Sequence, residues 1–128
     1  MNFIESIKYY WMNYATFTGR TSRKTFWWIV LFLFLAGSVI DLLFPGHTVV
    51  LDAVSGLKVT QTSTISQLWS LGTLVPSLAN AVRRLHDTGK TWVSLLWILL
   101  PLVGWIILIV KFAKAGDAGA NQFGEVGA

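Results

Sequence analysis

The most polar segment of the chain, from Arg83 to Trp92, could support acid–base, metal or phosphate chemistry. It contains five of the 18 side chains that are formally charged or histidine (10 basic, 6 acidic and 2 histidine). These five are Arg83, Arg84, His86, Asp87 and Lys90. An imidazole oriented by a carboxylate can act as a base or a metal ligand, and arginine pairs well with phosphate oxygens. Long apolar runs flank the segment, so we expect a turn between two membrane helices.

His86 and Asp87 are weak candidates for catalysis or metal binding. Zinc sites use three or four protein ligands, whereas the chain has two histidines and no cysteine. Neighbouring residues on a helix point in different directions, so each should bond a separate partner, such as a helix end, Arg20 or Arg23. The sequence also contains no nucleophile or phosphate-loop motif. We therefore expect no catalytic residues, no metal site and no cofactor.

The basic side chains around this segment form a candidate site for lipid headgroups or phosphate. Juxtamembrane basic clusters attract anionic lipid at about 1 kcal/mol per charge. The alternative is that the charges only orient the chain in the membrane. The compact Arg-Arg-x-His-Asp arrangement favours keeping the binding hypothesis. Its residues are Arg20, Arg23, Arg83, Arg84, His86 and Lys90.

The composition is that of a membrane protein. Hydrophobic residues make up 54% of the 128 residues and charged residues 12%, where soluble domains carry about 25% charged residues. The net charge of +4 could suggest nucleic acid. However, the basic residues lie beside apolar runs, where membrane topology explains them. We predict a single all-α integral membrane domain, residues 1–128, in contact with the lipid bilayer and with no nucleic-acid partner.

Four helical segments are predicted. Residues 3–17 have one aromatic and aliphatic side, which indicates an interfacial helix facing the acyl chains, or alternatively a helix packed on the protein. Residues 26–44 should form a first transmembrane helix, because a run of that length reaches about 28 Å across a core of about 30 Å. Residues 65–82 and 92–110 should form the second and third. The polar tail, 116–128, is expected to be loosely ordered.

The second transmembrane helix carries a polar stripe. A capping box at Thr64 to Gln67 should begin this helix, and Pro76 should kink it. The stripe consists of Ser66, Ser70, Thr73, Ser77 and Asn80. Spacings of four and three residues put these on one face, which should meet another helix or water rather than lipid. Close helix packing is the simpler interpretation, and a water-filled path is the alternative.

Asp41 is an acidic residue inside an apolar run. Such residues usually face other helices and find partners there. The second helix starts at the same end, so we predict that Gln67 or Ser70 bonds Asp41; a proton- or cation-carrying carboxylate is the alternative. The predicted helix-packing polar residues are Asp41, Gln67, Ser70, Thr73, Ser77 and Asn80.

Residues 45–64 should form a loop with some strand character. Thr48–Leu51 and Leu57–Thr60 flank Ser55-Gly56, a candidate hairpin turn.

Three spans would put seven basic residues on the side of the N-terminal segment and central turn. The other side would hold three: Lys58, Lys111 and Lys114. The positive-inside rule then predicts a cytoplasmic N-terminus and an external C-terminus. Pro101 and Gly104 leave an alternative, in which a re-entrant third segment returns the C-terminus to the cytoplasm.

Several motifs resemble those of the Domain-of-Unknown-Function 805 family of small bacterial inner-membrane proteins. FTGRTSR at 17–23, followed by Phe26-Trp27, is similar to its opening motif. VPSLA at 75–79, running into RRLHDTGK at 83–90, is similar to its central motif, and PLVG at 101–104 and GANQFG at 119–124 to its closing ones. The resemblance implies a multi-pass protein of the bacterial plasma (inner) membrane. It implies no activity.

The sequence as a whole predicts a non-enzymatic membrane module. Its cytoplasmic Arg/His/Asp segment would bind anionic lipid headgroups or a protein partner, either a second copy or another membrane protein. One alternative is an oligomeric pore or carrier that uses the polar stripe. The other is an enzyme acting on phosphate-headed lipids through His86 and Asp87.

Overall fold

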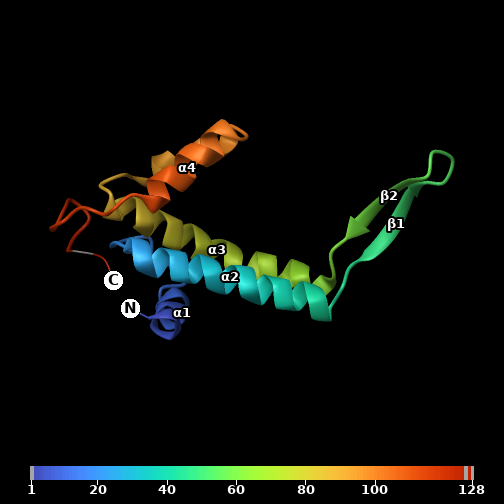
Figure 1. Ribbon diagram of the computed structural model, residues 1–128, viewed down its shortest axis with the longest axis horizontal. Coiled ribbons are helices and arrows are strands. Elements are labelled where there is room, and N and C mark those ends of the chain that lie inside the picture. The colour runs from blue at the N-terminus through green and yellow to red at the C-terminus, as the bar shows by residue number, and fades with distance from the viewer. Residues whose placement is uncertain (1, 126, 128) are drawn as a thin grey trace.

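The computed structural model describes residues 2–125 and 127, and in these it is mostly helical. Two long antiparallel helices, α2 and α3, lie side by side, and a β-hairpin projects from one end of the pair (Figure 1). The elements are α1 (Phe3–Met12), α2 (Arg23–Leu43), β1 (His47–Asp52), β2 (Leu57–Gln61), α3 (Thr64–Asp87), the 3-10 helix η1 (Trp92–Leu99) and α4 (Val103–Ala113). The all-α prediction therefore needs a correction for the hairpin. Three residues of the predicted domain and tail, Met1, Val126 and Ala128, lie outside the described part.

Helix α2 agrees with the predicted first span. Ser22 caps its N-terminus, where the side-chain oxygen accepts a hydrogen bond from the Thr25 backbone N–H at 3.4 Å. Its 21 residues correspond to about 31 Å. Within the described residues, α2 is the one helix both long and apolar enough to cross a membrane.

Helix α3 extends beyond the predicted membrane segment, 65–82, at both ends. Ser63, not Thr64, is its N-cap, and its side-chain oxygen accepts from the Ser66 backbone N–H at 3.2 Å. The predicted capping box is wrong because the Gln67 side chain donates instead to the Thr62 carbonyl at 3.1 Å. At the other end the helix continues through the charged segment to Asp87. The turn to the next element is consequently only residues 88–91.

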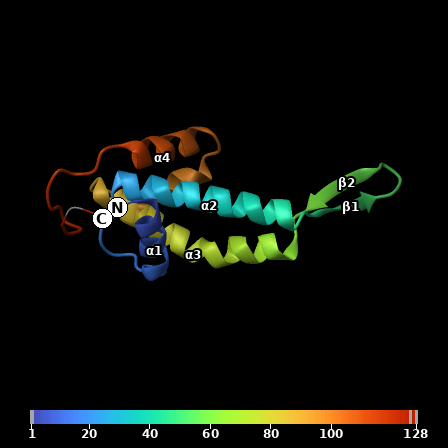
Figure 2. The same ribbon diagram turned by 60° about the horizontal axis from the view of Figure 1, so that its bottom comes forward.

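Helix α1 lies across α2 and α3 (Figure 2). It ends at Met12, earlier than the predicted 3–17. The Tyr10 ring is fully buried and its hydroxyl lies 2.9 Å from the Ser77 hydroxyl, while the Tyr14 hydroxyl donates to the Gly72 carbonyl at 2.6 Å. Tyr10 therefore packs on the protein, because a buried phenol hydroxyl finds a polar partner on α3. The rest of the predicted apolar side, Ile4, Trp11, Tyr14 and Phe17, is exposed.

The predicted third span, 92–110, is wrong: this segment is a helical hairpin. The chain reverses at Pro101 and at Leu102, whose φ of 63° is left-handed. The Trp105 indole N–H then donates back to the Ile98 carbonyl at 2.9 Å. A Cβ on Gly104 would lie 1.7 Å from the Trp97 carbonyl oxygen, so glycine is required where the arms meet. At about 2.0 Å per residue in η1 and 1.5 Å in α4, each arm measures about 16 Å, half of a bilayer core.

The projecting β-hairpin confirms the strand character predicted for residues 45–64. β1 and β2 are antiparallel, and Gly56 supplies the positive φ, 74°, of the turn. The Asp52 carboxylate accepts from the Val54 backbone N–H at 2.9 Å and from the Ser55 hydroxyl at 2.8 Å. These bonds organise the turn locally, without packing against the helices.

The buried core lies toward the opposite end of α2 and α3. Its apolar members are Tyr10, Phe26, Ile29, Ala79, Val82, Leu85 and Leu108. Buried charged residues accompany them, and they form the candidate site.

Candidate functional site

Five side chains form a buried cluster at the C-terminal end of α3, which we call the Arg/His/Asp cluster. Its members are Arg20, Arg83, Arg84, His86 and Asp87, each no more than 8% exposed. Three segments bring them together: α3 itself, the segment before α2, and the C-terminal tail. The Thr21 N–H donates to the Arg83 carbonyl at 3.0 Å, and the Asp117 N–H donates to the Asp87 carbonyl at 2.7 Å.

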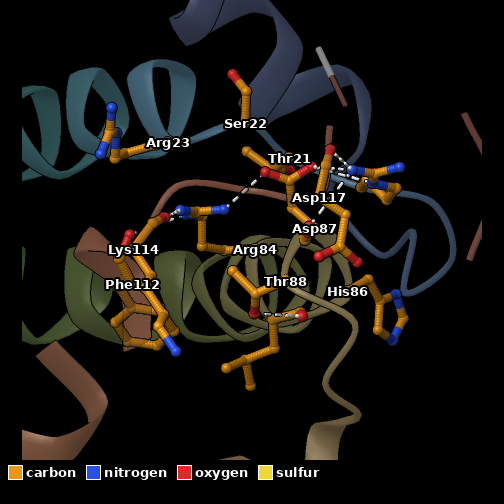
Figure 3. A network of polar contacts seen from close by, with 12 residues as sticks. Thr21, Ser22, Arg23, Arg84, His86, Asp87, Thr88, Phe112, Lys114 and Asp117 are labelled. Carbon is orange, nitrogen blue, oxygen red and sulfur yellow. Dashed lines mark hydrogen bonds and ion pairs between the residues drawn. The ribbon is translucent and has the colours of Figure 1, made fainter. Parts of the chain in front are cut away.

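Asp87 is the centre of the cluster. One carboxylate oxygen, Oδ1, accepts from Arg20 Nε at 3.0 Å and lies 2.9 Å from Arg20 Nη2. The other oxygen, Oδ2, accepts from Arg84 Nη1 at 2.8 Å (Figure 3). Charge-assisted bonds of this kind are the stronger hydrogen bonds in proteins. One buried carboxylate thus holds two guanidinium groups from different segments.

The remaining N–H groups of Arg20 bond the tail. Arg20 Nη1 donates to the carbonyls of Gly119 at 2.7 Å and Gly124 at 3.2 Å, and Nη2 donates to the Asp117 carbonyl at 2.8 Å. The prediction of a loosely ordered tail is therefore wrong over residues 117–124. A buried guanidinium needs acceptors for its five N–H groups, and these tail carbonyls supply them.

Arg84 likewise donates hydrogen bonds to backbone carbonyls, in this case at the end of α4. Its Nε donates to the Phe112 carbonyl at 2.9 Å, and its Nη2 donates to the Lys114 carbonyl (Figure 3). The last carbonyls of a helix have no partner inside the helix. Arg84 satisfies them for α4 and so keeps the returning arm of the hairpin at this end of α3.

Arg83 holds the segment that follows α1. Its Nε donates to the Thr21 hydroxyl at 3.1 Å, and its Nη1 donates to the carbonyls of Asn13 at 3.1 Å and Thr16 at 2.5 Å. The guanidinium also lies over the Tyr9 ring, 5.1 Å from its centroid. Within the described residues, Nη2 is buried without a hydrogen-bond partner.

His86 and Asp87 have separate partners, as helix geometry predicts. The His86 Nδ1 atom lies 2.9 Å from the Gly19 carbonyl oxygen, and the ring stacks on Phe123 with centroids 4.0 Å apart. Arg20 is confirmed as a partner of Asp87, but Arg23 is not. Arg23 donates to the Ala113 carbonyl at 3.3 Å instead, and Arg84 is the second arginine on the Asp87 carboxylate.

The predicted lipid- or phosphate-binding residues therefore divide into two groups. Arg20, Arg83, Arg84 and His86 are buried in the cluster, whereas Arg23 and Lys90 are exposed. The sequence reasoning missed Lys111 and Lys114, which it put on the far side of the membrane. The helical hairpin returns both lysines to Lys90, and together they line a cavity of about 280 Å³. Pro101 and Gly104 were the residues in the sequence that could have indicated this reversal of the chain.

The polar stripe of α3 faces its neighbouring helices over most of its length. Asp41 accepts a hydrogen bond from Ser66 at 2.5 Å, so the predicted partners, Gln67 and Ser70, are wrong. Successive helical residues lie about 100° apart, which turns Gln67 away from α2. Further along, Thr73 and Asn80 are buried, and Ser77 contacts Tyr10. Ser70 is the exposed member.

Comparison with known proteins identifies the family. The model of the family described as "Protein of unknown function (DUF805)" matches residues 14–125. Inner membrane protein YhaI of Escherichia coli K12 is 35% identical over 113 residues, which cover 88% of this chain and 86% of the relative. Inner membrane protein YhaH of the same strain is 32% identical over 114 residues, 88% and 87% of the two chains. No solved structure matches. The chain therefore belongs to the DUF805 family, and its homology to these relatives assigns it to the bacterial inner membrane.

Proposed function

We propose that the protein is a non-enzymatic module of the inner membrane whose cytoplasmic end binds anionic lipid headgroups. In this arrangement α2 crosses the bilayer, the less apolar α3 crosses antiparallel beside it, and the η1–α4 hairpin enters the bilayer and returns. The N-terminus and the tail are both cytoplasmic, and the β-hairpin is external. Helix α1 then lies near the membrane plane, as expected for an element that crosses α2 and α3.

The observation that carries this proposal is the distribution of basic residues. Nine of the ten lysines and arginines lie in the half of the molecule that contains the Arg/His/Asp cluster, and only Lys58 is on the β-hairpin. The positive-inside rule associates such an excess with the cytoplasmic side. The same side of the membrane carries anionic lipids, which attract exposed basic groups.

The geometry of the cluster favours a structural role over catalysis. A general base needs an unoccupied lone pair directed at a substrate proton. The Asp87 carboxylate receives both Arg20 and Arg84, and the His86 ring lies between the Gly19 carbonyl and Phe123. We infer that the cluster holds the cytoplasmic end in shape, while the exposed basic residues around it contact lipid.

The lipids retained by purified protein test this proposal. Lys24 and Lys58 are both exposed, but they lie at opposite ends of the molecule. Lys24→Gln should weaken retention of phosphatidylglycerol or cardiolipin about fivefold, the equivalent of one charge at about 1 kcal/mol. The matched control, Lys58→Gln, should leave retention unchanged. Equal effects of the two changes would contradict a binding cytoplasmic end.

The same preparation tests the absence of enzymatic activity. Phospholipids incubated with the protein should be recovered with unchanged headgroups. Headgroup turnover that is lost in His86→Ala would instead favour an enzyme acting on phosphate-headed lipids.

A further inference from the structure

A cationic pocket, separate from the Arg/His/Asp cluster, lies between the central turn and the end of α4. Its volume is about 280 Å³. It is lined by Thr88, Lys90, Lys111, Lys114, Ala115 and Asp117. We propose that this lysine pocket binds a phosphate monoester, with the headgroup of a phosphatidic-acid-type lipid as its source. The inference rests on the proposed function, because a headgroup reaches the pocket only if this end of the molecule lies at the membrane surface.

The lysine ammonium groups of the pocket are available to an anion. Within residues 2–125 and 127, the ion pairs are Arg20–Asp87 and Arg84–Asp87, neither of which involves a lysine. The carboxylate that lines the pocket, Asp117, accepts from the Asn121 side chain at 2.8 Å. Three lysines and one aspartate leave the pocket with a net charge of +2.

Arg84 already bonds carbonyl oxygens at the end of α4 that could otherwise compete with an anion for the lysine ammonium groups. Lysines in the last turn of a helix commonly bond the terminal carbonyls and interact with the negative end of the helix dipole. In α4 the carbonyls of Phe112 and Lys114 already accept from Arg84. Lys111 and Lys114 are therefore not needed to cap α4, and their ammonium groups can bind an external anion.

Charge and size favour a phosphate monoester. A monoester carries close to two negative charges at pH 7, because its second pKa is about 6, and this matches the pocket. A phosphodiester carries one. Ligand pockets for whole drug-sized molecules usually exceed about 300 Å³, so the 280 Å³ cavity suits a small headgroup.

An apolar groove on α4 favours a lipid as the source of the phosphate. Leu108 lies one helical turn from Lys111, on the same side of α4. It helps to line a groove of about 250 Å³ with Ile98, Trp105, Ile109 and Phe112. An acyl chain in this groove and a phosphate at the lysines would be parts of the same molecule.

The test compares two charge-matched double variants of the full chain. Lys90 and Lys114 line the pocket, whereas Lys8 and Lys24 are exposed in the same half of the molecule but outside it. Each protein is equilibrated with vesicles of phosphatidylcholine, phosphatidylglycerol and phosphatidic acid in equal amounts, and native mass spectrometry then counts the bound lipids. A second arm adds inorganic phosphate as a competitor.

We expect the unmodified protein to retain phosphatidic acid over phosphatidylglycerol. Lys90→Gln with Lys114→Gln should weaken phosphatidic acid binding about thirtyfold, the loss expected for two charges at about 1 kcal/mol each. Lys90→Arg with Lys114→Arg should preserve binding, which would exclude misfolding as the cause. Lys8→Gln with Lys24→Gln should lower retention of both anionic lipids equally and leave the preference intact.

The outcomes distinguish phosphate binding at the lysine pocket from the more general proposal that the exposed basic residues bind anionic lipid. An unchanged preference for phosphatidic acid over phosphatidylglycerol in Lys90→Gln with Lys114→Gln would overturn the pocket but keep a lipid-binding surface. No loss in either variant would overturn both. Displacement of phosphatidic acid by inorganic phosphate would support a phosphate site, yet make soluble phosphate rather than lipid its source.

Discussion

Arg20 and Asp87 are 67 residues apart in the sequence, and their side chains meet with Arg20 Nε 3.0 Å from Asp87 Oδ1. The contact joins the segment that enters α2 to the residue that ends α3. Arg20 then continues to the carbonyls of the tail, so one side chain connects three segments.

Asp87→Asn should destabilise the protein strongly. The substitution would remove the negative charge between Arg20 and Arg84, both buried, and loss of one partner from a buried ion pair costs about 3–5 kcal/mol. The measurement is the unfolding midpoint of purified protein in detergent. Glu5→Gln removes an exposed carboxylate on α1 and should have little effect. A similar midpoint for both variants would mean that the cluster contributes little to stability.

Gly116→Ala should loosen the tail, and Gly119→Ala should not. A Cβ on Gly116 would lie 1.9 Å from Asp87 Oδ2, whereas nothing lies within 4 Å of one on Gly119. Overpacking of this kind typically costs about 1–3 kcal/mol. Limited proteolysis of the C-terminal segment should therefore accelerate in Gly116→Ala alone. Equal cleavage rates in the two variants would contradict the contact between the tail and Asp87.

Cysteine labelling tests the proposed re-entrant path. The natural chain has no cysteine, so Leu57→Cys, Thr91→Cys and Ala120→Cys can each be labelled alone; all three residues are exposed. In intact spheroplasts an impermeant maleimide should modify only Leu57→Cys. Permeabilisation should make all three reactive. Reaction of Ala120→Cys in sealed spheroplasts would put the tail outside and restore a third span.

Ser66→Ala should weaken the contact between α2 and α3 slightly. Its hydroxyl bonds Asp41, and interhelical hydrogen bonds in membranes average about 0.6 kcal/mol. The loss should be several times smaller than that of Asp87→Asn in the same unfolding assay. Ser70→Ala, which alters an exposed member of the stripe, is the control. A larger loss in Ser70→Ala than in Ser66→Ala would contradict the packing.

Asp52 should titrate below its ordinary pKa of 3.8, first because of the Ser55 hydroxyl and then because of the Val54 backbone N–H. Since folding lowers this pKa, the stabilisation of the turn is present above the ordinary value. It is lost as the pH falls through the lowered one. Carboxyl-carbon NMR of the intact protein should detect the low midpoint. Ser55→Ala should raise it, and Thr60→Ala on β2 should not.

Local patterns were sufficient to predict some elements. An apolar run after Ser22 predicts α2, and Ser55-Gly56 between β-branched residues predicts the hairpin turn. Helix geometry also predicts that His86 and Asp87 have separate partners, with Arg20 as one candidate. Each of these inferences uses residues close together in the sequence or a property of regular helices.

The path of the third segment could not be decided in that way. Pro101 and Gly104 are compatible with a kinked span as well as a reversal. The carbonyls of Phe112 and Lys114 bond Arg84, which is a contact between distant residues. Nor could the sequence predict that the arginines are buried. A basic residue beside an apolar run has the same sequence pattern whether it is exposed or buried.

Arg20 bonds residues about 100 positions later in the sequence, which has a consequence for biogenesis. A ribosome delivers Arg20 and Asp87 to the membrane well before Phe112, Asp117 and Gly119, whose carbonyls complete the hydrogen bonds of Arg84 and Arg20. Until then the nascent chain carries guanidinium groups without their final acceptors. This end of the molecule can therefore complete its hydrogen bonds only after the helical hairpin and the tail have been synthesised. A chain interrupted before Gly119 would keep these groups incompletely bonded, which gives membrane quality control a chemical difference to detect.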